Sequence, residues 1–118
     1  MVYEWHEATA IASGYGVDML PQVFSIEIAE GRGLGAMLMP HDIIVVSRTQ
    51  APGAGDGVLV LSRGQLSTAV AWPSEDGIVL QVLSGVITRI DAETRVVGTV
   101  VGMPTLRLGR LTCYASAG

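Results

Sequence analysis

The chain has 118 residues, of which 49% are hydrophobic and 15% charged, so it is long enough and apolar enough for one domain around one buried core. Its formal net charge of −4 argues against nucleic acid as a direct partner, because that contact is driven by clustered cations. No apolar run is long enough to span a membrane, and the acidic N-terminus lacks the basic start of a signal peptide, which predicts a cytoplasmic protein.

Three successive parts of a single domain are predicted over residues 1–118. An N-terminal extension, a core and a C-terminal strand with its tail are expected at residues 1–21, 22–103 and 104–118. The extension holds Gly14, Gly16 and Pro21, which leave no room for a helix-turn-helix unit. No internal repeat or linker divides the chain.

The first strands of the core are predicted from alternation and from apolar runs. In residues 23–28, Phe24, Ile26 and Ile28 alternate with polar positions, which is typical of a half-buried strand. The continuous apolar run at residues 57–62 instead favours a strand buried on both faces. Further strands are predicted at residues 42–48, 66–72, 78–83, 85–90, 94–103 and 106–108. The sequence therefore predicts an all-β fold with no long helix.

Three segments of the core carry a resemblance to a known family. They are residues 42–46, 55–60 and 96–102, and the similarity covers about residues 22–103. In order and spacing they resemble the LexA/UmuD-type self-cleaving serine peptidases, which include the C-terminal domains of many phage repressors. The resemblance implies a compact, β-barrel-like fold of short twisted strands.

The Ser-Lys dyad of that family is missing from this chain. The resemblance places the serine at Gly33 and the general-base lysine at Ala69, and all seven basic residues of the chain are arginines. A serine hydroxyl is a weak nucleophile until a neutral amine takes its proton, so both parts of the chemistry are lost. The only candidate for the family's cleavage bond is Ser13-Gly14, and nothing in the sequence would cut it. We therefore expect a protein without enzymatic activity.

Other chemistry finds little support in the sequence. The spacing of Gly31, Gly33 and Gly35 is superficially similar to a dinucleotide-binding loop, but Pro40 arrives too soon for the helix that such a loop requires. His6 and His41 have acidic neighbours but lie far apart in the sequence, which is common by chance. We predict no cofactor and no metal.

Dimerisation is the partner prediction that the family implies. Residues 95–101 are apolar and β-branched, and an exposed edge of this kind would promote aggregation unless it were paired. Thr99 and Val101 are expected on one face of the strand, with Val100 on the other. The predicted homodimer interface consists of Val97, Thr99, Val101 and Met103.

Three functions remain open from the sequence. The first is a catalytically inactive LexA/UmuD-like regulatory or interaction domain, phage- or prophage-related, which dimerises or binds a repressor-type partner in transcription regulation. The second is a UmuD-like accessory protein that binds a polymerase or recombinase of the DNA-damage (SOS) response. The third is an unrelated small β protein that binds a ligand or has enzymatic activity. A start at Met1 favours a complete small protein over a piece of a longer repressor.

Overall fold

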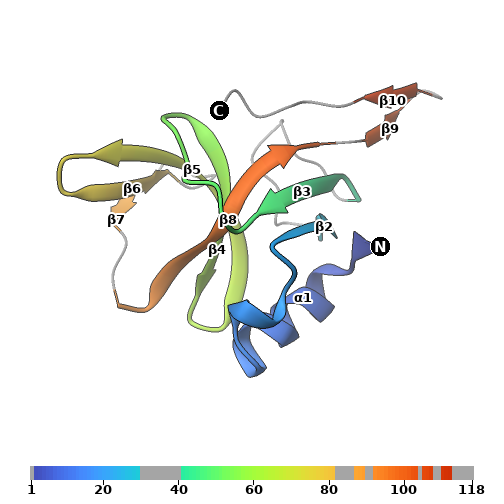
Figure 1. Cartoon of the computed structure of the whole chain (residues 1–118), viewed down its shortest axis with the longest axis horizontal. Coiled ribbons are helices and arrows are strands. Elements are labelled where there is room, and N and C mark those ends of the chain that lie inside the picture. Colours follow the sequence, from blue (N-terminus) through green and yellow to red (C-terminus); the bar gives the residue numbers. More distant parts are fainter. Residues whose placement is uncertain are drawn as a thin grey trace.

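The computed structural model describes residues 2–29, 41–81, 87–89, 92–103, 105–107 and 110–112. Within these residues the chain forms one α-helix, one 3-10 helix and ten strands (Figure 1). In chain order they are β1 (Val2–Tyr3), α1 (Trp5–Gly14), η1 (Val17–Met19), β2 (Val23–Glu27), β3 (Ile43–Ser47), β4 (Asp56–Ser62), β5 (Gln65–Ser74), β6 (Gly77–Gln81), β7 (Ile87–Arg89), β8 (Thr94–Gly102), β9 (Thr105–Arg107) and β10 (Arg110–Thr112).

Eight of these strands form one sheet in the order β1-β2-β3-β8-β4-β5-β6-β7. All neighbours are antiparallel except β1 and β2, which run parallel. Strands β9 and β10 pair only with each other and form a hairpin beyond the end of β8 (Figure 1). The fold is therefore mainly β, as the sequence predicts.

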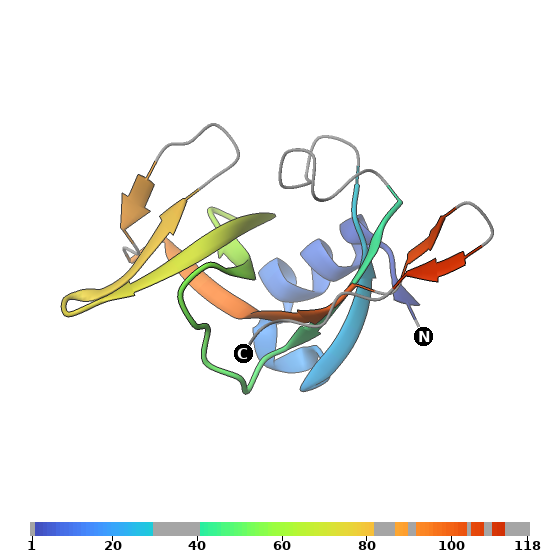
Figure 2. The ribbon, with the colours of Figure 1, turned by 90° about the horizontal axis from the view of Figure 1, so that it is seen from above.

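Helix α1 covers one face of the sheet (Figure 2) and contributes Trp5, Ala8 and Ala12 to the larger core cluster. Part of the segment predicted as an N-terminal extension, residues 1–21, therefore packs in the core. Alanine is the strongest helix former, and the turn after the helix is made by Gly16 with a φ of 110°. The helix is too short to cross a membrane, and no other described helix is long and apolar enough to do so.

Strand β4 is buried on both faces, as its continuous apolar sequence predicts. Leu59 belongs to the larger cluster beneath α1. Val58 and Val60 point to the opposite face, where they pack with Ala69, Ala71 and Leu80 in a second cluster. The alternation in β2 is also confirmed, because Phe24, Ile26 and the following Ile28 are all buried in the larger cluster.

Strand β8 lies inside the sheet, between β3 and β4. Its register shifts against each neighbour, and Gly98 lies close to β3. A Cβ atom on Gly98 would come within 2.6 Å of the backbone oxygen of Ser47, which real Cβ atoms essentially never do. The absence of a side chain at this position therefore permits the close pairing of β8 with β3.

Candidate functional site

The structure describes one of the two predicted dyad positions. Ala69 lies in β5, opposite Val58 of β4, and its exposed fraction is 0%. Its neighbours in the second cluster are apolar, so the methyl group fills core space. Gly33 lies outside the described residues. The arrangement of the two positions relative to each other is therefore not part of the described structure.

The candidate cleavage bond, Ser13-Gly14, lies in the last turn of α1. The hydroxyl of Ser13 donates a hydrogen bond of 2.7 Å to the backbone oxygen of Thr9, one helical turn earlier. Segments that bind a peptidase as an added strand are extended. The helical backbone at this bond differs from that conformation.

The predicted dimer residues lie on β8, an inner strand of the sheet, and directly after it. Strand β8 pairs with β4 between Thr94 and Thr99, and with β3 between Thr99 and Gly102. Val97 and Thr99 are buried, whereas Val101 and Met103 are half-buried, and Met103 packs against the larger cluster. In this conformation Val97 and Thr99 are not available to a second copy. The pairing of β8 with β3 and β4 joins segments that are distant in the sequence, and the local sequence of β8 did not indicate it.

Thr99 has a structural contact that the sequence did not suggest. Its hydroxyl is fully buried and donates a hydrogen bond of 2.7 Å to the backbone oxygen of Gln50. The hydroxyl of Ser47 lies 3.3 Å from that of Thr49 and accepts a hydrogen bond from the backbone N–H of Gln50. These contacts fasten the segment after β3 to the sheet. The sequence feature that could have indicated these contacts is a hydroxyl residue within an otherwise apolar strand, Ser47 in β3 and Thr99 in β8.

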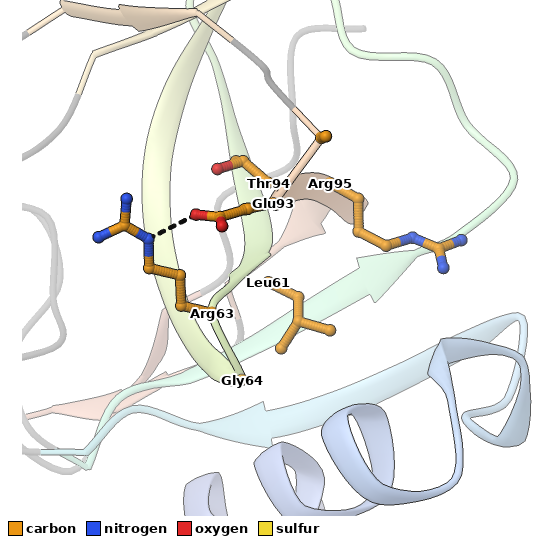
Figure 3. Close-up of a pocket in the computed structure, with 7 residues that line it drawn as sticks. Leu61, Arg63, Gly64, Glu93, Thr94 and Arg95 are labelled. Atoms are coloured by element: carbon orange, nitrogen blue, oxygen red, sulfur yellow. Dashed lines mark hydrogen bonds and ion pairs between the residues drawn. The ribbon is translucent and has the colours of Figure 1, made fainter.

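A shallow depression of about 470 Å³ lies at the turn between β4 and β5. The hairpin contributes Leu61, Arg63 and Gly64 (Figure 3). Glu93 directly precedes β8, and Arg95 lies at the start of that strand. We call this the turn pocket. It brings together charged residues that are about 30 positions apart in the sequence.

Backbone geometry and two contacts position Arg63 in the turn pocket. Arg63 and Gly64 have φ values of 52° and 77°, the left-handed region that a tight two-residue hairpin turn requires. The backbone N–H of Arg63 donates to the backbone oxygen of Glu93, at 3.3 Å. Its side-chain Nε donates to Glu93 Oε2, at 2.8 Å. Because both side chains are largely exposed, this ion pair orients Arg63 more than it stabilises the fold.

Arg95 lies across from Leu61 in the pairing of β4 with β8. Its side chain is exposed and makes no hydrogen bond or ion pair with any residue in the described part of the chain. Guanidinium groups donate hydrogen bonds, accept none and are poor bases. The chemistry of the turn pocket is therefore suited to binding an anion rather than to proton transfer.

His41 contacts one potential metal ligand, and His6 lies apart from it on α1. The Nδ1 atom of His41 lies 2.9 Å from Glu27 Oε2, and His6 is exposed on α1. Across the described ranges, no group of three or more histidine, cysteine, aspartate and glutamate side chains is placed to hold a metal ion.

Comparisons of the chain with protein-family profiles and with curated proteins found no match. The LexA/UmuD resemblance therefore rests on the sequence motifs alone. The proposed function rests on those motifs and on the surfaces of this structure.

Proposed function

We propose that this chain is a non-enzymatic regulatory domain of the LexA/UmuD type that acts by pairing with a second copy or with a repressor-type protein. Two features support the absence of catalysis. The chain contains no lysine, and the residue at the expected position of the general base is the core alanine Ala69. No amine side chain is present to activate a serine there.

The observation that carries the interaction role is an apolar surface on β1, β2 and β3, on the face opposite α1. In the sheet register, Val2 pairs with Ser25, which pairs in turn with Val45. Val23 and Ile43 lie on the same face, because they are two positions from Ser25 and Val45 along β2 and β3. We call Val2, Val23, Ile43 and Val45 the open face.

The open face is exposed at the edge of the sheet. Val23 is 57% exposed and Val2 is 45% exposed, while Ile43 and Val45 are half-buried. Ser25 lies between Val2 and Val45, and Glu27 pairs with Ile43, so polar residues alternate with these apolar ones on the same face. Exposed apolar side chains that gather on one face commonly mark protein-interaction surfaces. This location replaces β8 as the proposed pairing surface, because Val97 and Thr99 of β8 are buried.

Light scattering during size exclusion tests the pairing of two copies. We expect the wild-type chain to approach twice its monomer mass as its concentration rises, because pairing would bury the open face. The Val23→Asp variant should remain monomeric at the same concentrations. A matched control is Tyr15→Asp, which changes an exposed side chain at the end of α1, on the other face of the sheet.

The proposal also allows pairing with a repressor-type protein in place of a second copy. A strictly monomeric wild-type chain that also binds no related repressor would contradict it. If both variants lose pairing equally, the open face is not the surface involved.

A further inference from the structure

The described lining of the turn pocket carries more positive than negative side chains, whereas the whole chain carries a net negative charge. The whole chain carries a formal charge of −4. The pocket, by contrast, is lined by two arginines, Arg63 and Arg95, and by one carboxylate, Glu93. An excess of guanidinium groups at a concave surface of an acidic protein favours a ligand that carries carboxylates or phosphates.

Arg63 is held in place before any ligand arrives. Its left-handed backbone is uncommon for a residue with a long side chain, and such conformations are enriched at functional sites. The contact with Glu93 uses Nε. Figure 3 shows the two terminal nitrogens of Arg63 directed away from that carboxylate. These nitrogens form a donor pair that suits a bidentate contact with a carboxylate.

Arg95 provides a second donor group on the other side of Leu61. Its backbone pairs with Leu61 of β4, while its side chain is exposed to solvent. In Figure 3 the guanidinium groups of Arg63 and Arg95 point in opposite directions from the centre of the pocket. One compact anion is therefore a poor match for both, and an extended ligand with separated anionic groups is a better one.

We infer that the turn pocket binds an extended acidic peptide segment of a partner protein, with one carboxylate at Arg63, another at Arg95 and the peptide backbone over Leu61. A nucleic acid strand is also extended and anionic. It is disfavoured because the described residues that line the pocket include two cations and no aromatic side chain on which a base could stack. This inference rests on the proposed interaction role and adds the chemistry of the partner.

Fluorescence anisotropy with a defined probe tests the inference. The probe is a fluorescein-labelled hexapeptide of alternating glutamate and alanine, and the matched peptide has glutamine in place of glutamate. We expect the wild-type chain to bind the glutamate peptide, with an affinity that falls as salt is added. The Arg95→Ala variant should bind it about tenfold more weakly, as expected for a lost hydrogen bond to a charged group.

Two further variants show whether the effect is local. Arg63→Asn removes the second guanidinium but keeps a residue that tolerates the left-handed turn, so it should weaken binding to a similar extent. Arg107→Ala, in β9, removes the same charge outside the turn pocket and should leave binding unchanged. Cooperative thermal unfolding with a midpoint no lower than that of wild type would show that the variants are folded.

Several results would overturn the inference. Equal binding of the glutamine peptide, equal loss in Arg107→Ala, or full binding in Arg95→Ala would each do so. Tighter binding of a labelled thymidine hexamer than of the peptide would assign the pocket to nucleic acid. If the chain forms dimers through the open face but does not bind the peptide, only this inference fails and the proposed function stands.

Discussion

The fully buried hydroxyl of Thr99 donates a hydrogen bond of 2.7 Å to the backbone oxygen of Gln50, across 49 positions of sequence. This contact joins an inner strand of the sheet to the segment that follows β3. Because Thr99 is fully buried, its hydroxyl has no access to bulk water and depends on this acceptor.

Replacing Thr99 by Val removes the hydroxyl and preserves the shape of the side chain. We expect the free energy of unfolding to fall by about 0.5–1.5 kcal/mol, because the variant loses the hydrogen bond to Gln50. Amide hydrogen exchange should also accelerate in residues 48–55. Thr99→Ser keeps the donor and should leave that exchange nearly unchanged, which separates the hydrogen bond from side-chain packing. Identical exchange in both variants would contradict this role.

Gly98→Ala should destabilise the sheet. The added methyl group would meet the backbone oxygen of Ser47 at 2.6 Å, so β8 or β3 must shift. We expect a loss of about 1–3 kcal/mol in urea unfolding, in line with other overpacked cores. Gly57→Ala is the matched control, because its methyl group would meet Val100 at an ordinary 3.6 Å. Equal stability of the two variants would be inconsistent with the close approach of β8 to β3.

Ala69→Lys restores the residue type that the family resemblance expects at this position. In this structure the amine would enter an apolar cluster beside Val58, and an uncompensated buried charge costs about 3–5 kcal/mol. We expect a large drop in the thermal midpoint and no cleavage product by mass spectrometry. Gln65→Lys, at the exposed start of β5, is the control and should be neutral. A stable Ala69→Lys protein that cleaves itself would refute the account of this position.

Arg63→Asn tests the strain in the β4–β5 turn. Asparagine adopts the left-handed conformation more readily than arginine, whereas the exposed ion pair with Glu93 contributes little. We therefore expect the variant to be more stable than wild type, by up to about 1 kcal/mol in urea unfolding. Glu93→Gln removes the ion pair and keeps the turn, and it should change stability by less than about 0.5 kcal/mol. A destabilised Arg63→Asn protein would show that the arginine contacts matter more than the turn.

Local patterns in the sequence predicted most of the strands. The apolar run of β4 and the alternation of β2 report burial directly, because side chains alternate between the two faces of a sheet. Helix α1 was missed because the glycines that end it were interpreted as breaks in the whole segment, although its alanines favour a helix. Strand β1 has only two residues, too few to form a pattern.

Long-range relationships could not be predicted from the sequence. The position of β8 between β3 and β4 depends on pairings between distant segments, and it places Val97 and Thr99 inside the sheet. The turn pocket depends on the same pairing, which brings Arg63 next to Glu93. No local pattern in the sequence connects these two residues.

A tagged pull-down from the native cell, with and without DNA damage, tests the central claim most directly. Mass spectrometry would identify the proteins that bind the wild-type chain and the Val23→Asp variant. The proposed function predicts that wild type enriches a helix-turn-helix repressor and that Val23→Asp does not. Enrichment of a polymerase or recombinase would favour the accessory role instead. Recovery of the wild-type chain alone, together with a monomeric mass, would contradict an interaction role.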